Sequence, residues 1–293
     1  MVGRCSVVVV GRITARRSLT KVTVGQESRT RIDTLAVEEP LEIRVGGMPL
    51  AVTMRTPGHD VELAAGFLVS EAIIHARDQF EAAIHCGGAA AGGAPNQYNV
   101  LDIGLGAGAR LPDATAARNF YTTSSCGLCG KASIDAVTTV SAFDVSSDPV
   151  CVDAADIVTY PDRLRAAQAV FDKTGGLHAA GLIDAQSGEL LVVREDVGRH
   201  NAVDKVVGWA LLHGRLPLHG TVLQVSGRAS FELVQKAAMA GIAVLAAVSA
   251  PSSLAAELAD EAGITLIGFL RGESMNIYTR PDRVRIPTAA TAL

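Results

Sequence analysis

The last third of the chain alternates short apolar runs with amphipathic segments, and this alternation limits the fold more than any other feature. Strands are predicted at 222–225, 242–247 and 264–270, with helices at 229–239 and 252–261 between them. A strand, helix, strand order in such short steps brings successive strands together in parallel, with the helices on the faces of the sheet. The sequence therefore predicts an α/β fold whose sheet contains parallel neighbours.

Three connecting segments follow these strands and are candidates for a ligand site. They are 226–228, 251–253 and 271–274. Sheets of this kind bind ligands beyond the carboxyl ends of their strands. Arg228 and Arg271 add positive charge suited to charge-assisted contacts with phosphate, so we predict a phosphate-bearing ligand at this edge. For Arg228, a surface ion pair is the competing interpretation.

Serine residues stand where the two helices are predicted to begin. Ser230, Ser252 and Ser253 occupy these starts, where unpaired backbone N–H groups and the positive end of the helix dipole favour an anion. Ordinary N-capping is the stronger explanation for any one of these serines. The phosphate interpretation depends on their meeting the arginines on a single edge of the sheet.

The rest of the chain is predicted to contain an arm and a smaller domain. Residues 1–25 are expected to be a basic, poorly ordered arm. Residues 26–114 are predicted to form an α+β domain, because a hairpin pattern at 41–54 precedes a helical pattern at 61–72. Residues 115–293 then form the larger α/β domain, which carries both the cysteine loop and the nucleotide site.

Composition excludes several classes of protein. With 293 residues, 48% hydrophobic and 19% charged, the chain is long enough for one large or two modest cores. A net charge of −4 gives no electrostatic case for wrapping nucleic acid. The longest apolar stretch, 237–250, is too short to span a bilayer, and the start shows no secretory signal. Five cysteines, an odd number, suit a reducing cytoplasm.

Cys126 and Cys129 form the most chemically suggestive motif, because each is followed by a glycine. Gly127 and Gly130 permit backbone angles that other residues resist, so the thiols are expected on an exposed, mobile loop. Lys131 and a helix predicted to begin near Cys129 place positive potential beside the sulfurs, which favours thiolate over thiol. The motif therefore predicts a sulfur nucleophile.

Three other interpretations of this cysteine pair stay open. A structural zinc site would need two more ligands, and the sequence holds no second Cys-X-X-Cys and no His-X3-His pair. A thioredoxin-like redox pair would follow the first strand of a βαβ unit, whereas this pair lies in mid-chain after Ser124 and Ser125. The third interpretation is an inert pair in a surface turn.

The segment 193–205 is unusually dense in side chains capable of chemistry. His200 is the sharper candidate, because it changes charge near neutral pH and could orient a ligand or assist a thiol. His178 could reach the same region if the two strands involved are adjacent. A solvated helix start with internal ion pairs is the competing interpretation. The segment contains Glu195, Asp196, Arg199, His200, Asn201, Asp204 and Lys205.

Several motifs together resemble the FdhD family, whose members are sulfurtransferases needed to make formate dehydrogenase active. The resemblance covers most of the chain, and several long matches in the same order make chance similarity improbable. The matching motifs are 56–60 (TPGHD), 124–130 (SSCGLCG), 174–180 (TGGLHAA), 194–205 (REDVGRHNAVDK), 226–236 (SGRASFELVQK) and 250–254 (APSSL).

This resemblance implies a cytoplasmic protein that accepts sulfur from a cysteine desulfurase as a persulfide. The sulfur would pass to the molybdenum cofactor, bis-molybdopterin guanine dinucleotide, for which GDP would serve as a mimic. By position, Cys126 corresponds to the persulfide carrier and Cys129 to its helper in transfer or release. The family's cofactor-contacting segment corresponds to Phe269, Leu270, Arg271, Gly272, Glu273 and Ser274. Arg228, Ser253 and His200 complete the predicted cofactor site.

The family is also related in fold to cytidine deaminases, so the resemblance implies a three-layer, cytidine deaminase-like domain over 115–293. A zinc deaminase needs a His-X-Glu and a Pro-Cys-X-X-Cys. This chain has no His-X-Glu, and serine rather than proline precedes Cys126. Deamination is therefore not expected, and no metal site is predicted.

Two other classes of function stay open beside sulfur transfer. One is a chaperone that binds the immature cofactor or the dehydrogenase without covalent chemistry, which would make both cysteines dispensable. The other is a nucleotide-binding redox regulator with a reversible disulfide between Cys126 and Cys129. The expected partners are a cysteine desulfurase and the catalytic subunit of formate dehydrogenase, without nucleic acid or membrane. A homodimer is a further expectation.

Overall fold

A mixed six-stranded sheet forms the centre of the molecule. The computed structural model describes residues 13–86, 98–110 and 141–286. The strand order in the sheet is β13-β12-β11-β10-β8-β9. The strands are β8 (His178–Asp184), β9 (Leu190–Asp196), β10 (Thr221–Val225), β11 (Val244–Ala247), β12 (Thr265–Arg271) and β13 (Ser274–Ile277).

The pairing of these strands confirms the α/β prediction and extends it. β10 pairs in parallel with β11, and β11 in parallel with β12, as the alternating sequence pattern indicates. β8 and β13 join this parallel centre in antiparallel orientation. β8 and β9 form an antiparallel hairpin. The sheet is therefore parallel only where helical crossovers connect the strands.

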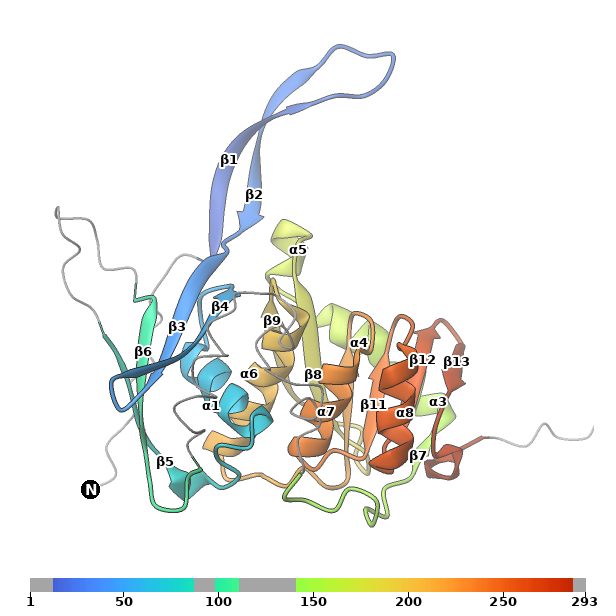
Figure 1. Ribbon diagram of the computed structural model, residues 1–293. Coiled ribbons are helices and arrows are strands. Elements are labelled where there is room, and N and C mark those ends of the chain that lie inside the picture. Colours follow the sequence, from blue (N-terminus) through green and yellow to red (C-terminus); the bar gives the residue numbers. More distant parts are fainter. Residues whose placement is uncertain (1–12, 87–97, 111–140, 287–293) are drawn as a thin grey trace, which may run out of the picture.

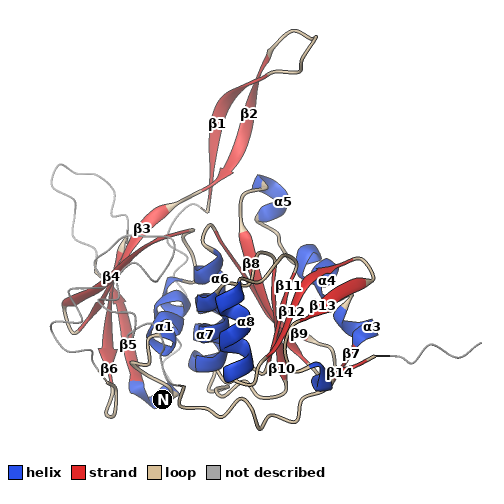
Figure 2. Cartoon of the chain, turned by 45° about the vertical axis from the view of Figure 1, so that its right-hand side comes forward, coloured by secondary structure: helices blue, strands red, loops and turns tan. Residues whose placement is uncertain are grey.

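Helices cover both faces of this sheet (Figure 2). One face carries α6 (Arg199–Leu212), α7 (Phe231–Met239) and α8 (Ser253–Glu261), and α1 (Asp60–Ser70) packs against α6. The other face carries α3 (Ala154–Ile157) and α4 (Tyr160–Ala166), with α5 (Phe171–Thr174) near one end of the sheet. A short parallel pair, β7 (Val152–Asp153) and β14 (Val284–Arg285), lies beside them. The resemblance to cytidine deaminases remains a prediction at this level of detail.

A second, four-stranded sheet lies beyond α1, in the order β4-β3-β6-β5 (Figure 1). The predicted hairpin is confirmed, because β3 and β4 pair antiparallel. β6 continues this sheet in parallel with β3, and η1 (Arg77–Gln79) leads into β5. The strands are β3 (Glu39–Val45), β4 (Met48–Arg55), β5 (Phe80–His85) and β6 (Val100–Leu105).

The expectation of a poorly ordered arm is wrong for much of residues 13–25. β1 (Thr14–Lys21) pairs antiparallel with β2 (Arg29–Ala36) over its whole length, from Thr14 opposite Ala36 to Lys21 opposite Arg29. The two strands form a ribbon that projects from the body of the molecule (Figure 1). Backbone pairing with a later segment makes β1 a strand, and the local apolar pattern carries little sign of it.

Helices α1 and α6 bring the two predicted domains into direct contact. A Cβ atom on Gly66 would lie 1.8 Å from the carbonyl oxygen of Asp204, and one on Gly208 would lie 1.8 Å from that of Glu62. The two backbones therefore touch at a distance that only glycine allows. A single cluster of buried hydrophobic residues extends from Leu41 through both regions to the C-terminal strands. The larger and the smaller sheet thus share one core.

The described part of the chain contains no helix that is both long and apolar enough to cross a bilayer.

Candidate functional site

A cavity of about 590 Å³ opens at the edge of the large sheet where the parallel strands end. Its wall includes Ser226 after β10, Val248 after β11 and the end of β12. His178 reaches the same edge because β8 runs antiparallel to β10 and begins there. Residues of α4 and α5 close the other side, including Arg165 and Phe171. The cavity therefore occupies the position that strand order predicts for a ligand.

The segment 269–274 lies at the rim of this cavity. Leu270, Arg271 and Gly272 line it directly. A bulge between Gly268 and Arg271 interrupts the pairing of β12 with β13, and Phe269 has a φ of 51° within it. This strained conformation is held by a hydrogen bond from the Phe269 N–H to the carbonyl oxygen of Ser249, 3.1 Å long. The bulge thus fixes how the end of β12 faces the cavity.

The other residues of the predicted cofactor site lie around the cavity without lining it. Arg228, Ser253, Glu273 and Ser274 are exposed. The guanidinium of Arg271 lies 6.0 Å from the centroid of the Phe269 ring, so these two predicted residues contact each other. The contribution of the exposed residues to ligand binding stays a prediction.

The serines at the helix starts have different partners. The Ser252 hydroxyl accepts a hydrogen bond from the N–H of Ala255, 3.2 Å long, and caps α8 as the simpler interpretation expects. Ser230 precedes α7 but makes no cap hydrogen bond. Its hydroxyl instead lies 3.2 Å from Nε2 of His200.

His200 is buried against the first turn of α7 and does not line the cavity. Besides Ser230, its Nε2 lies 2.5 Å from a carboxylate oxygen of Glu232. These contacts link α6 to α7. The direct contact of His200 with a ligand stays a prediction.

His178 is the histidine that faces the cavity. Burial lowers the pKa of His178 below its ordinary value of 6.5, and the positive charge of Arg199 lowers it further. The carboxylate of Asp196 opposes this shift. β8 and β9 are adjacent, and His178 is paired with Asp196, four residues before His200, so the two histidines lie in one region as predicted.

Asp196 is the centre of a buried network beneath the cavity. Its side chain is fully buried and forms an ion pair with Lys205, 2.7 Å long. It also accepts hydrogen bonds from the backbone N–H groups of Thr56 and Gly198 and from the side chain of Asn201. The dense segment is thus a structural junction in which these charges are satisfied internally.

The remaining acidic groups of that segment also have defined partners. Glu195 accepts hydrogen bonds from the backbone N–H groups of Val170 and Phe171, which begin α5 beside the cavity. Asp204 forms an ion pair with Lys236 on α7, 2.7 Å long. The expected solvated helix start is wrong on one point, because the ion pairs are buried rather than exposed to solvent.

Arg199, the first residue of α6, belongs to the dense segment 193–205, but the sequence pattern assigned it no role of its own. Its Nε is buried and has no hydrogen-bond partner among the described residues. The signal for it in the sequence is its position directly after Gly198, where a predicted strand gives way to a predicted helix.

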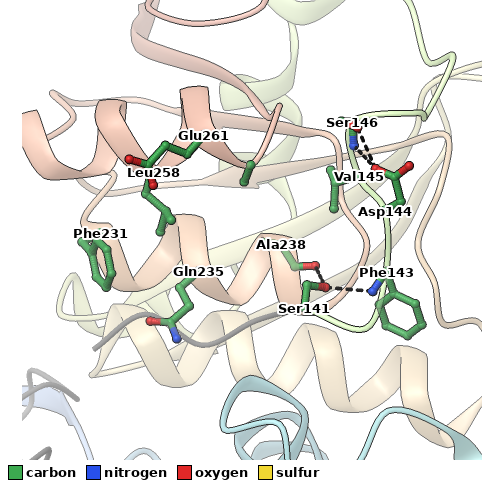
Figure 3. Close-up of a pocket in the computed structure, with 11 residues that line it drawn as sticks. Ser141, Phe143, Asp144, Val145, Ser146, Phe231, Gln235, Ala238, Leu258 and Glu261 are labelled. Atoms are coloured by element: carbon green, nitrogen blue, oxygen red, sulfur yellow. Dashed lines mark hydrogen bonds between the residues drawn. The ribbon is translucent and has the colours of Figure 1, made fainter. Parts of the chain in front are cut away.

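Figure 3 shows a different and smaller cavity, of about 310 Å³, between α7, α8 and residues 141–146. Of the predicted site residues that the structure describes, none lines that second cavity.

Cys126 and Cys129 lie outside the described residues. Among the residues that are described, no group of three or more His, Cys, Asp or Glu side chains is arranged to hold a metal ion. The site that the structure describes is a cavity built from strand ends, with arginine and histidine side chains in its lining.

Comparisons with known proteins place this architecture in a family. The model of the FdhD/NarQ family matches residues 36–285. The sulfur carrier protein FdhD of Mycolicibacterium paratuberculosis is 62% identical over 273 residues, which cover 93% of this chain and 99% of that protein. The protein of the same name from Streptomyces avermitilis is 59% identical over 282 residues, 96% of this chain and 99% of its own length.

A solved structure agrees in fold. A crystal structure from Desulfotalea psychrophila, provisionally described as a formate dehydrogenase accessory protein, superimposes with a TM-score of 0.71. The match covers 94% of this chain and all of the other, at 23% sequence identity. Family model and close relatives agree over nearly the whole length, and the chain belongs to the FdhD/NarQ family.

Proposed function

We propose that this protein is a cytoplasmic sulfur carrier that serves the maturation of formate dehydrogenase. The names of its relatives, sulfur carrier protein FdhD, support the sulfur-carrying part at 62% and 59% identity. The cavity at the strand ends supports the other part, a binding site for the molecule that receives the sulfur. The cysteine desulfurase that supplies the sulfur and the dehydrogenase that receives the product are the proposed partners.

The proposed chemistry begins with the Cys126 thiolate. It attacks the terminal sulfur of a persulfide on the desulfurase, the S–S bond breaks, and the desulfurase cysteine leaves as a thiolate. Cys126 then carries the sulfur as its own persulfide. In release, the Cys129 thiolate attacks the inner sulfur and a sulfide leaves, which leaves a disulfide between Cys126 and Cys129. A cellular dithiol reductant returns the pair to thiols.

The substrate that receives the sulfide is bis-molybdopterin guanine dinucleotide, and we propose that one nucleotide end of it docks at the strand ends. A cavity of about 590 Å³ lies within the usual range of roughly 300–1,000 Å³ for small-molecule sites. Arg271 contributes positive charge for phosphate, and the backbone at Gly272 carries no side chain to block its approach. The single observation that carries this half of the proposal is that residues 270–272 meet His178 in one cavity.

Persulfide transfer is tested with matched cysteine variants. Wild-type protein is incubated with a desulfurase and cysteine, and its intact mass is measured. We expect a gain of one sulfur atom that disappears in Cys126→Ala and persists in Cys86→Ala, since Cys86 is an exposed free cysteine of the described region. Activation of formate dehydrogenase should follow the same order. Full activation by Cys126→Ala would instead support the non-covalent chaperone.

Nucleotide binding is tested with GDP by calorimetry. We expect binding by the wild-type protein that is weakened when residues 269–274 are replaced by a glycine and serine linker of equal length. Repeating the titration after mild oxidation tests the alternative function of a redox regulator. That function requires the GDP affinity to change when Cys126 and Cys129 form a disulfide. Unchanged GDP affinity in the replaced variant would remove the strand-end cavity from the proposal.

A further inference from the structure

Arg199 differs from every charged neighbour in the segment that crosses beneath the cavity. Arg194 pairs with Glu62 at 2.8 Å, Asp196 with Lys205 and Asp204 with Lys236. For Arg199, the described residues supply neither a carboxylate nor a hydrogen-bond acceptor to the guanidinium, and its Nε is buried. A buried, unmatched donor on a cation is costly, because its lost hydration is not replaced. Such a group is stabilised when an anion binds.

The position of Arg199 adds a second, independent observation. A Cβ atom on Gly227 would lie 3.4 Å from Nδ1 of His178 and 4.0 Å from Cδ of Arg199. Both side chains therefore converge over the backbone of Gly227, directly after β10. His178 and the adjoining Ser226 line the cavity. Since glycine has no side chain, the space between the two groups at this point stays open.

We propose that Arg199, His178 and the backbone at Gly227 form an oxyanion subsite at the wall of the cavity, which takes a phosphoryl group of the bound nucleotide. This inference rests on the proposed function, because the cavity is taken to hold a nucleotide. It differs from the sequence-based assignment, in which the exposed Arg228 and Ser253 bind the phosphates.

The chemistry of the groups favours a phosphoryl oxyanion. A guanidinium presents a planar fork of donors that matches two oxygens of one phosphate. The neighbouring imidazole donates a further hydrogen bond from one ring nitrogen. Arg199 also begins α6, a helix of 14 residues whose N-cap, Gly198, has no capping side chain. The first N–H groups of this helix add positive potential at the same place.

The experiment compares GDP with guanosine, which has the same base and sugar but no phosphate. Arg199→Gln is the test variant, and Arg215→Gln is its control. Arg215 lies just beyond the other end of α6 and stacks on Trp209, 5.1 Å from the ring centroid, so the control removes the same charge far from the cavity. We expect Arg199→Gln to lose at least about tenfold in GDP affinity, as charge-assisted hydrogen bonds do. Guanosine affinity should stay the same in all three proteins.

Two outcomes separate this inference from the proposed function. If Arg199→Gln binds GDP as tightly as the wild type, the subsite is wrong while the nucleotide cavity stands. If the wild type does not bind GDP, the nucleotide assignment is wrong, and inorganic pyrophosphate then decides the subsite. Pyrophosphate must shift the NMR signal of the Arg199 Nε–H group in the wild-type protein, and the absence of that shift overturns the inference.

A structural role for Arg199 gives a different pattern. Loss of fold would lower the melting temperature and weaken GDP and guanosine alike. Arg199→Lys supplies a further distinction, because it retains the charge but not the planar fork. We expect its GDP affinity to fall between those of the wild type and Arg199→Gln, with the melting temperature unchanged. An equal loss of affinity for GDP and for guanosine in the two variants contradicts the subsite.

Discussion

An arginine lies at each end of the parallel strands in the large sheet, and the two arginines differ in their hydrogen-bond partners. At the amino ends of β11 and β12, Arg283 is buried, with 3% of its surface exposed. At the carboxyl ends, Arg199 has a buried Nε without a partner among the described residues. The guanidinium of Arg283 donates to the carbonyl oxygens of Val145, Ser146, Asp148, Ala243 and Gly263.

This difference distinguishes an arginine that stabilises the fold from one that is available to bind a ligand. Arg283 connects the segment 145–148 to the starts of two strands, and the carbonyl oxygens around its guanidinium accept its hydrogen bonds. Arg199 has the same chemistry but lacks those acceptors. The fold supplies hydrogen-bond acceptors to the guanidinium of Arg283 but none to the Nε of Arg199 among the described residues. The unpaired donor of Arg199 therefore indicates where an external anion binds.

The largest expected effect is the loss of stability when Arg283, at the amino ends of β11 and β12, is replaced. Arg283→Ala leaves several buried carbonyl oxygens without donors and creates a cavity, so we expect roughly 3–5 kcal/mol to be lost from the free energy of unfolding. Arg199→Ala should cost less than about 1 kcal/mol, because no acceptor of the described chain loses a bond. Urea unfolding of both variants measures the difference. Equal losses would contradict the comparison of the two edges.

Glycines at the two edges supply the next test. Gly263 has a φ of +69°, and a Cβ there would lie 2.8 Å from Cβ of Ser146. We expect Gly263→Ala to destabilise the fold by about 1–3 kcal/mol, from backbone strain and overlap together. Gly227→Ala meets His178 only at 3.4 Å, an ordinary contact, and should leave stability nearly unchanged. Its methyl group fills the proposed subsite, so GDP affinity should fall instead.

The sequence carries enough information to predict the sheet edge but not the contacts within it. Parallel strands and their carboxyl ends follow from local apolar periodicity, and residues 270–272 do line a cavity there. The pairing of β1 with β2 and the partners of Arg199 depend on residues far apart in the chain, which no local pattern reveals. Glu195, which looked chemically suggestive, caps α5. The burial of a side chain and its hydrogen-bond partners decide such roles, and both are known only from the three-dimensional structure.

A smaller effect is expected from pH. Burial and the charge of Arg199 lower the pKa of His178, while the carboxylate of Asp196 acts in the opposite direction. The folded protein therefore binds a proton here less readily than the unfolded chain, whose pKa is 6.5. The stability that the neutral ring contributes is present above pH 6.5 and declines as the pH falls through the lower pKa of the folded state. Unfolding at pH 8 and pH 5.5 should show this decline, and His178→Gln should reduce it.

GDP affinity should respond to pH in the opposite direction. Protonated His178 attracts a phosphoryl oxyanion, so the wild-type protein should gain affinity relative to His178→Gln as the pH falls from 8 to 5.5. The comparison with the variant cancels the protonation of the phosphate itself. The other charged side chains in the described lining of the cavity are Asp162, Arg165 and Arg271, and the titratable and charged groups that act on His178 are Arg199, His200 and Asp196. All of them are common to both proteins. Parallel pH profiles would contradict a place for His178 in the subsite.

The smallest effect is expected from Arg228, although the sequence singled it out. Arg228 is exposed, and an exposed charge is screened by water and salt, so its contact with phosphate contributes little. We expect Arg228→Gln to weaken GDP binding by less than about threefold at low salt and to match the wild type at 0.5 M salt, where the Debye length falls below about 8 Å. The loss in Arg199→Gln should persist at both salt concentrations, because partial burial protects that contact from screening. If the GDP affinities of the two variants instead respond to salt in the same way, the burial of Arg199 does not strengthen anion binding at the strand ends. The distinction between Arg199, with its unpaired Nε, and Arg283, with its full set of acceptors, then has no consequence for binding.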